Sequence, residues 1–257
     1  MEIDQVTYGS VNRSRMKGYQ VIGKSSGVDA AMASAFCKWA PSHNSLEVGD
    51  DQSPREAWAL SFFPLLDDHF AVARSVHGGP EYSGRGGLAV MTSALVLSRK
   101  QMANLAFDAI GVSRTALTFG HLILQSGFDE ALPEITLPSQ LLNLPTPQTD
   151  FVDAGDPVLP SHAVQWIARE SCSLLRDGRK VMIVGACNPL PILSLLFEQL
   201  KSAERREVSF SCGLKSSSRR DFRVQFTSQT MSLKLQRELD RGGIVAIDVA
   251  RVLIETE

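Results

Sequence analysis

Residues 180–200, KVMIVGACNPLPILSLLFEQL, contain the clearest strand–turn–helix pattern of the chain. Lys180-Val184 is a short run rich in β-branched residues, which is typical of a buried strand. Gly185 turns the chain, and Asn188-Pro189 supplies an N-cap followed by a proline at the first helical position. Isoleucine and leucines then recur at helical spacing, so this stretch predicts a strand followed by a helix that packs on the sheet.

The rest of the second half continues this alternation of helix and strand patterns. One helical pattern precedes the stretch, and two strand patterns, a helix and a last strand follow it. These elements are expected at residues 161–178, 207–212, 222–226, 231–239 and 244–248. The order α-β-α-β-β-α-β predicts a sheet with helices packed on it.

A polar turn, KSSSRR, joins the two strand patterns at 207–212 and 222–226. We expect these strands to pair as an antiparallel hairpin. The hairpin would put one basic cluster at its tip and a second one at the other end of the first strand, on the order of 20 Å away. The tip cluster is Lys215, Arg219 and Arg220, and the second cluster is Arg205 and Arg206.

The first half is richer in strand patterns. Strands are expected at residues 3–8, 18–23, 57–63, 70–76 and 88–97. Two capping-box spacings, beginning at Ser26 and Ser98, predict helix starts, and the first helix is expected to end near Trp39 before Pro41. A shorter helix is expected around 114–124.

A proline-rich segment separates the two halves. Residues 132–160 contain six prolines, which favour an extended chain that runs over the surface. We therefore expect an N-terminal α+β domain at 1–145 and a middle α/β domain at 146–257; an ordinary long connection within one domain is the alternative. The predicted fold class is mixed α/β or α+β, with two lobes that each contain a small, mostly mixed sheet and packed helices.

Composition excludes several classes of protein. With 44% apolar and 21% charged residues, the chain of 257 residues can form a packed core. A net charge of −2 gives no general attraction to nucleic acid or to an anionic membrane. No apolar run is long enough to span a bilayer, and the acidic, polar N-terminus does not look like a signal peptide. We expect a cytoplasmic protein that does not bind membranes.

The cysteines and histidines follow no pattern of a metal or redox site. Cys37, Cys172, Cys187 and Cys212 lie far apart and are expected to be reduced, small core residues. The five histidines form no HExxH or HxH pattern, so no metal is expected. The turn after Val184 lacks the glycines and lysine of a phosphate-binding loop, so it is interpreted as a capped turn. No cofactor is expected.

The loop from His77 to Gly87 has the most unusual local composition, HGGPEYSGRGG. Its glycines would let a ligand approach the backbone closely. His77, Tyr82 and Arg85 are therefore candidate binding residues, and Glu81 would add a carboxylate. In the alternative interpretation the glycines serve only the turn of a long hairpin, and the polar groups face water.

Positive charge is concentrated in the last part of the chain. Residues 201–257 include 11 basic and 8 acidic residues, whereas the first 200 have a net charge of −5. The candidate binding residues here are Arg205, Arg206, Lys215, Arg219 and Arg220. They suit an acidic protein partner, and the tip cluster would contribute to binding mainly by raising the rate of association. A solvated face is one alternative. Nucleic-acid binding is the other, and the scarcity of interleaved aromatic residues argues against it.

Several short stretches resemble the bacterial GTPase-associated protein family. Tyr8-Gly9-Ser10, Gly18-Tyr19-Gln20-Val21-Ile22, Ser25-Ser26-Gly27-Val28 and Gly84-Arg85-Gly86-Gly87 resemble its N-terminal domain. Gly178-Arg179-Lys180-Val181 and the segment from Arg205 to Gly213 resemble its middle domain, where a basic residue precedes an SFSTG-like strand. Cys212 stands here in place of the threonine.

The resemblance implies a component of bacterial multi-gene systems that are linked to GTPases and act in conflict or defence. Such a protein would be a non-catalytic adaptor or scaffold, and its partner would be a small GTPase or another product of the same gene cluster. The sequence contains no catalytic motif, which also favours a non-catalytic role. The alternative hypothesis is an enzyme or nucleotide sensor with its site at the 77–87 loop, where the polar residues would have to converge with groups from the second half.

Overall fold

A computed structural model of the chain describes every residue except 14–15, 49–52, 67, 82–86, 124–129, 143–158, 187, 218 and 257. The strands of the first half are β1 (Glu2–Arg13), β2 (Met16–Lys24), β3 (Trp58–Leu65), β4 (His69–Pro80), β5 (Leu88–Ser98) and β6 (Ile135–Thr136). Its helices are α1 (Ala30–Trp39), α2 (Arg99–Asn104) and α3 (Ala109–Thr118). The second half contains, in chain order, α4 (Ser161–Arg176), β7 (Lys180–Val184), α5 (Leu190–Gln199), α6 (Ser202–Arg205), β8 (Phe210–Cys212), β9 (Val224–Thr227), α7 (Leu233–Gly242), β10 (Ile244–Asp248) and α8 (Val249–Thr256).

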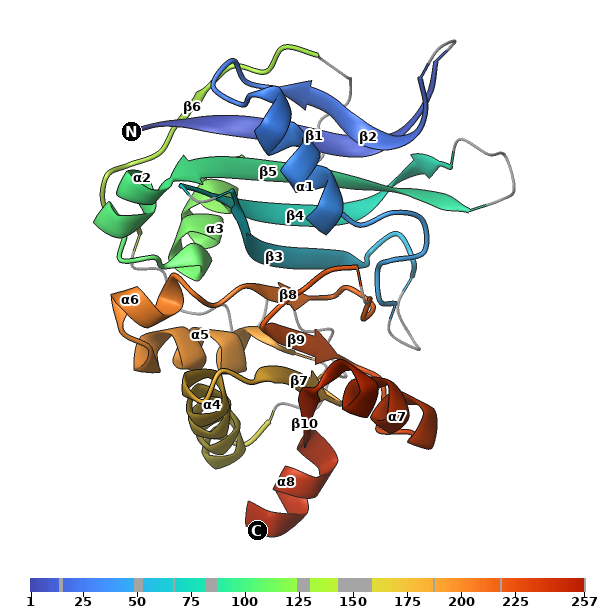
Figure 1. The fold of residues 1–257 in the computed structure, drawn as a ribbon, viewed down its shortest axis with the longest axis vertical. Helices are drawn as coiled ribbons and strands as arrows, with labels where there is room; N and C mark the ends of the chain where they lie inside the picture. The colour runs from blue at the N-terminus through green and yellow to red at the C-terminus, as the bar shows by residue number, and fades with distance from the viewer. Residues whose placement is uncertain are drawn as a thin grey trace.

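These strands form one sheet that runs through both halves (Figure 1). Their order is β10-β7-β9-β8-β3-β4-β5-β1-β2, and β6 pairs with β1. The strands of the first half pair antiparallel, and β8, β9, β7 and β10 pair parallel. The mixed α/β class is thus confirmed.

The pairing of β3 with β8 joins the two halves. It is antiparallel, with Leu60 opposite Cys212 and Phe62 opposite Phe210. The expectation of a separate small sheet in each lobe is therefore wrong, because β8 pairs with β9 along one edge and with β3 along the other. The expected boundary at 145/146 lies outside the described residues and stays a prediction.

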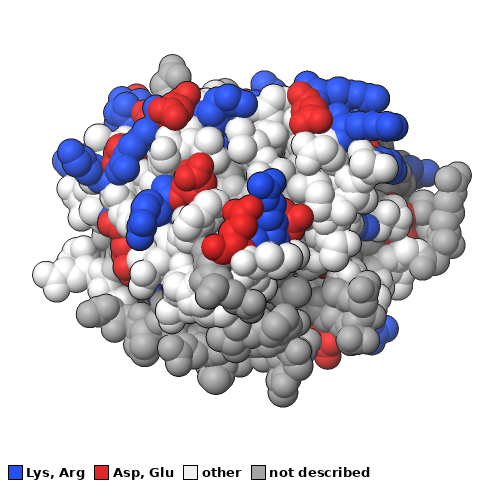
Figure 2. Space-filling model, turned by 90° about the horizontal axis from the view of Figure 1, so that it is seen from below, with Lys and Arg blue, Asp and Glu red and all other residues white. Residues whose placement is uncertain are grey.

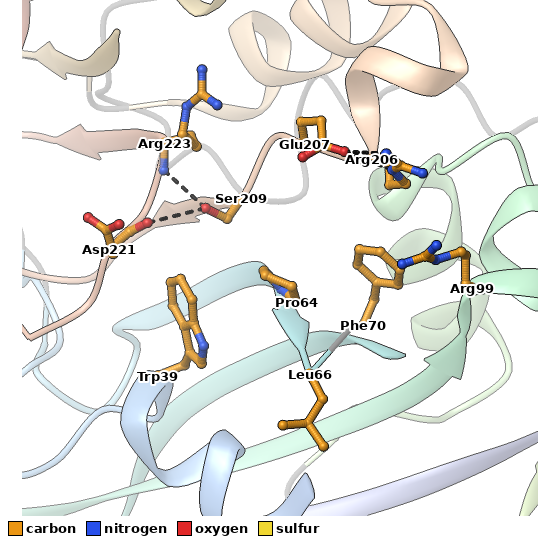
Figure 3. Close-up of a pocket in the computed structure, with 10 residues that line it drawn as sticks. All are labelled: Trp39, Pro64, Leu66, Phe70, Arg99, Arg206, Glu207, Ser209, Asp221 and Arg223. Carbon is orange, nitrogen blue, oxygen red and sulfur yellow. Dashed lines mark hydrogen bonds and ion pairs between the residues drawn. The ribbon is translucent and has the colours of Figure 1, made fainter. Parts of the chain in front are cut away.

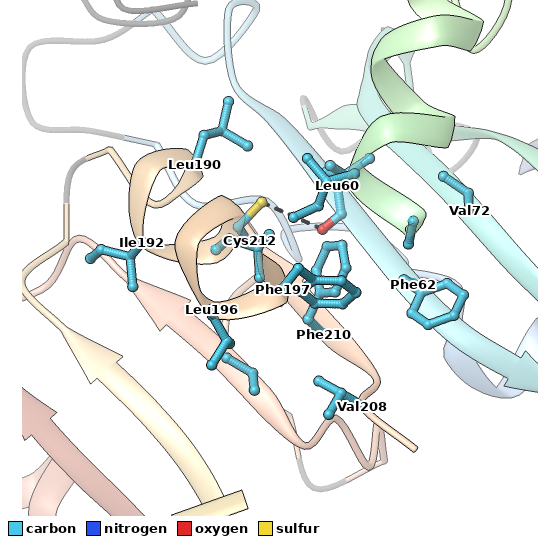
Figure 4. Packing of buried hydrophobic residues seen from close by; sticks show 14 of the residues in the cluster. Leu60, Phe62, Val72, Leu190, Ile192, Leu196, Phe197, Val208, Phe210 and Cys212 are labelled. Carbon is cyan, nitrogen blue, oxygen red and sulfur yellow. Dashed lines mark hydrogen bonds between the residues drawn. The ribbon is translucent and has the colours of Figure 1, made fainter. Parts of the chain in front are cut away.

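The largest hydrophobic cluster also spans both halves (Figure 4). The rings of Phe62 and Phe210 lie 6.0 Å apart, and Phe197 of α5 meets Phe210 edge-on at 5.4 Å. Residues from α2, α3, α4, α5 and α8 cover this face of the sheet. On the opposite face, α1 packs over the first half and α7 over the second half. A continuous apolar face explains why the halves form one sheet.

Most of the predicted elements are present, with local differences. Asp29 caps α1 instead of Ser26, since its carboxylate accepts a hydrogen bond of 2.7 Å from the Met32 amide. The capping box at Ser98 is confirmed, whereas α3 begins and ends about five residues before the expected span. Cys172 and Cys212 are buried as expected, Cys37 is exposed, and Cys187 lies outside the described residues.

The predicted antiparallel hairpin of β8 and β9 is wrong, because these strands are parallel, with Phe210 opposite Val224. After β8, Gly213 adopts a φ of +77° and the chain runs along residues 45–47, where Leu214 bridges Leu46. The chain then returns, and the amide of Val224 donates to the carbonyl of Ser209. A connection of this length replaces the tight turn that a hairpin needs.

Candidate functional site

A hollow of about 360 Å³ opens where the two halves meet (Figure 3). The turn between β3 and β4 and the end of α1 form one wall, and the segments before β8 and β9 form the other. We call this hollow the junction groove. Its lining residues are Trp39, Pro64, Leu66, Phe70, Arg99, Arg206, Glu207, Ser209, Asp221 and Arg223.

The first wall is mainly apolar and is held rigidly. The indole of Trp39 stacks on Phe63 with ring centroids 5.2 Å apart and planes 12° from parallel. It also contacts Phe222 at 5.1 Å. Leu66 follows β3 with a φ of +56° and remains 50% exposed. A fixed tryptophan beside an exposed leucine offers an apolar surface whose side chains lose little freedom on binding.

The second wall is polar and hydrogen-bonded within itself. The Ser209 hydroxyl accepts from the amide of Arg223 at 3.1 Å and lies 3.5 Å from the carbonyl of Asp221, to which it donates (Figure 3). The carboxylate of Asp221 pairs with Lys180. These bonds fix the backbone of the wall, so the groove keeps its shape without a ligand.

Among the described residues, three arginines line the groove, and two of them form exposed ion pairs. Arg99 pairs with Asp68 at 3.2 Å, and Arg206 pairs with Glu207 at 2.7 Å. The side chains of these two pairs are between 44% and 71% exposed. Exposed ion pairs contribute little stability, so an incoming carboxylate can replace the internal one at small cost.

The third arginine, Arg223, is held more deeply. Its Nη2 donates to the carbonyl of Leu175 at 2.9 Å. Its Nε is buried and has no hydrogen-bond partner among the described residues. A buried donor without a partner costs free energy, which a ligand oxygen or a bound water would recover.

The groove has the composition of a recognition surface. Tryptophan and arginine dominate the binding energy of protein interfaces, usually around an apolar centre. The described part of the lining includes no histidine or cysteine, and its two carboxylates are paired with basic side chains. Within the described ranges, no group of three histidine, cysteine or acidic residues is placed to hold a metal ion.

The predicted site at the glycine-rich loop is only partly described. Tyr82 and Arg85 lie outside the described residues. His77 lies on β4, and its Nδ1 forms a hydrogen bond with the carbonyl of Pro54. Seven residues separate it along the strand from Phe70 of the junction groove, a distance of about 23 Å. His77 therefore belongs to a different region of the molecule.

The five predicted basic residues are dispersed. Only Arg206 lines the junction groove. Arg205 donates to the carbonyls of Leu200 and Ala106 and so connects α6 to the first half. Lys215 Nζ donates to the Asn44 side chain at 2.8 Å, and the Arg219 side chain is exposed.

Arg220 does not lie at an exposed tip. It is only 9% exposed, and its Nη2 donates to the carbonyl of Lys215 at 2.8 Å. Burial lowers the pKa of its guanidinium, and Tyr8 nearby acts in the opposite direction. The pKa of Tyr8 is raised to about 12, mainly by burial. Arg220 is thus a buried residue near Tyr8.

Two other ionisable groups lie near β3 and β8, where the halves meet: Glu47 is half-buried and Cys212 is fully buried. The carboxylate of Glu47 accepts from the amide of Ser228 at 3.1 Å, and burial raises its pKa. Burial also raises the pKa of the Cys212 thiol to about 12, and Cys212 Sγ lies 3.6 Å from the carbonyl of Leu60. At that pKa the thiol stays protonated, so Cys212 is a core residue.

Sequence reasoning did not single out the apolar wall of the groove. Trp39 and Phe70 were assigned to a helix and a strand, and Arg99 to a helix start. The one available signal was the run Pro64-Leu65-Leu66, in which a second leucine continues past the end of a strand pattern. Arg223 belongs to the basic segment of the sequence that could bind phosphates or an acidic partner, but no sequence pattern placed it beside Trp39 and Phe70.

The first wall of the groove lies within a recognised domain. Residues 2–138 match the family model described as GTPase-associated protein 1, N-terminal domain type 2. The chain belongs to the GTPase-associated protein family. Searches of curated proteins and of solved structures found no match.

The family match confirms the resemblance to the GTPase-associated protein family over the N-terminal domain, and the resemblance of residues 178–213 to the middle domain stays a prediction. In this GTPase-associated protein, the matched region includes Trp39, Pro64, Leu66, Phe70 and Arg99, whereas the second wall of the groove lies outside it. Among the described residues, no helix is long and apolar enough to cross a membrane.

Proposed function

We propose that this GTPase-associated protein is a non-catalytic cytoplasmic adaptor that binds a protein partner in the junction groove. The partner is a small GTPase or another product of the same bacterial gene cluster, within a system of the conflict or defence type. The observation that carries the proposal is the groove itself, an apolar wall around Trp39 and Leu66 faced by arginines from both halves.

The groove also indicates the chemistry of the partner's contact surface. Leu66 and the Trp39 indole suit an apolar side chain, which would be the centre of the contact. Arg99 and Arg206 suit carboxylates on either side of it, because the planar guanidinium binds a carboxylate with two parallel hydrogen bonds. We expect an apolar anchor flanked by acidic residues.

The proposal is tested by co-expressing the chain with the products of its neighbouring genes. Size-exclusion chromatography with light scattering should show a stoichiometric complex at micromolar concentration. Leu66→Asp should abolish that complex, since it places a carboxylate in the apolar wall. Ile123→Asp is the matched control, because Ile123 is similarly exposed, at 46%, but does not line the groove.

The absence of any complex with these products would contradict the proposal. So would a complex that Leu66→Asp and Ile123→Asp affect equally, because the contact surface would then lie elsewhere.

A further inference from the structure

Among the residues that the structure describes, β10 is the last strand of the sheet. No strand of the described chain pairs with its outer edge. Residues 244–247 are Ile-Val-Ala-Ile, and such an apolar run is typical of an interior parallel strand. Ile244, Val245 and Ala246 are nevertheless partly exposed. The composition therefore fits a strand that has a neighbour on both sides.

The neighbouring strand shows which backbone groups of β10 point outward. On β7, the amide of Val181 donates to the carbonyl of Arg223, on the β9 side. Backbone groups alternate along a strand, so those of Met182 face β10. Met182 is opposite Ala246, and in a parallel pair its bonds go to Val245 and Ile247. The N–H and C=O groups of Ile244 and Ala246 and the N–H of Asp248 therefore point to the outer edge, whereas the C=O of Asp248 precedes α8 (Val249–Thr256) and accepts the first bond of that helix.

The opposite edge of the sheet, formed by β2, is protected against pairing with another strand. β2 has Lys17 and Lys24 near its two ends, and lysines discourage edge pairing. The backbone of Lys24 is also bonded to Glu130 and Leu132. β10 has no lysine and no proline, and its single charged residue is Asp248 at the carboxyl end. Of the two edges, β10 is the one open to strand addition.

We propose that β10 pairs antiparallel with β10 of a second copy of this chain, with the two-fold axis beside Ala246. The sheet would then continue through the dimer. Ala246 would lie opposite Ala246 of the second copy, and Ile244 opposite Asp248. Each Ala246 N–H would then donate to the Ala246 C=O of the other copy, and each Asp248 N–H to the Ile244 C=O. The Ile244 N–H would donate to the second lone pair of the Asp248 C=O, so this register satisfies the outward groups of β10.

Charge complementarity favours a second copy as the occupant. The exposed Arg241 lies just before the amino end of β10, and Asp248 lies at its carboxyl end. Antiparallel pairing would bring Asp248 of each copy near Arg241 of the other. Figure 2 shows this end of the molecule, where basic and acidic side chains of the described residues lie close together without a broad region of one sign. Two such faces can approach each other without strong repulsion.

The test measures self-association by sedimentation equilibrium on the whole chain. We expect a monomer–dimer equilibrium with a dissociation constant below about 100 µM. Ala246→Pro removes an outward N–H but none that bonds to β7, so it should weaken dimerisation at least about tenfold and leave Tm nearly unchanged. Ile247→Pro is the matched control, since it removes an inward N–H and should lower Tm.

Arg241→Glu provides a second variant at an exposed side chain. It should weaken the dimer several-fold because it places two carboxylates together, and the effect should shrink at high salt. A wild-type chain that stays monomeric at about 100 µM would overturn the proposal and leave the edge for a strand of another protein. A dimer that both Ala246→Pro and Arg241→Glu leave unchanged would overturn it as well. This proposal does not depend on the junction groove.

Discussion

At the scale of single residues, Glu47 makes the stability of the fold depend on pH. Its pKa in the folded chain lies above the usual value of 4.5 because burial opposes ionisation. The folded state therefore binds the proton more tightly than the unfolded state, and this group's contribution to stability falls as the pH rises from 4.5 through the raised pKa.

Replacing Glu47 with glutamine should remove this dependence. Glutamine still offers a carbonyl oxygen to the amide of Ser228 but does not ionise. We expect Glu47→Gln to be more stable than the wild type at about pH 8 and no more stable at about pH 4, measured by urea denaturation. A wild type that is the more stable protein at the higher pH would show that the ionised carboxylate is well accommodated.

The two adjacent arginines of the 215–220 turn should differ in their effect on stability. Arg220→Ser removes a buried side chain and its bond to the Lys215 carbonyl, so we expect a loss of about 2 kcal/mol. Arg219→Ser changes an exposed side chain and should cost less than about 0.5 kcal/mol. Chemical denaturation of both variants measures the difference, and equal small effects would contradict the burial of Arg220.

At the scale of elements, the residue that caps α1 in the structure differs from the one that the sequence pattern suggests. The spacing from Ser26 to Asp29 suggests a cap at the serine, but the carboxylate of Asp29 accepts the hydrogen bond. Asp29→Ala should therefore lower the free energy of unfolding by about 1 kcal/mol, and Ser26→Ala by much less. Thermal unfolding of the two variants decides between the positions, and a larger effect at Ser26 would favour the sequence pattern.

Periodicity predicted most strands and helices but not how β8 and β9 pair. Alternation of apolar residues over Val208, Phe210 and Cys212 shows which side chains face the core, and it is the same for parallel and antiparallel neighbours. The direction of pairing depends on the path of the connection. That path is set by Gly213 and by the bridge between Leu214 and Leu46, which are 168 residues apart in sequence.

At the scale of the whole molecule, the pairing of β3 with β8 produces both the continuous sheet and the junction groove. Leu60 and Cys212 are separated by about 150 residues, and no local pattern links them. The candidate site likewise depends on contacts between residues that are far apart in the sequence. Arg206 was recognisable as one of a basic pair, whereas Trp39, Leu66 and Arg99 are brought together by the fold of the first half and face Arg206 only after the halves have joined.

The measurement that tests the central claim most directly is the affinity of the partner for variants of the two walls. Isothermal titration calorimetry would compare Leu66→Asp on the first wall, Arg206→Glu on the second wall and the control Ile123→Asp. We predict that each wall variant raises the Kd at least about tenfold, as interface centres do, while the control matches the wild type. A wall variant that binds as tightly as the wild type would contradict a partner site shared by both halves.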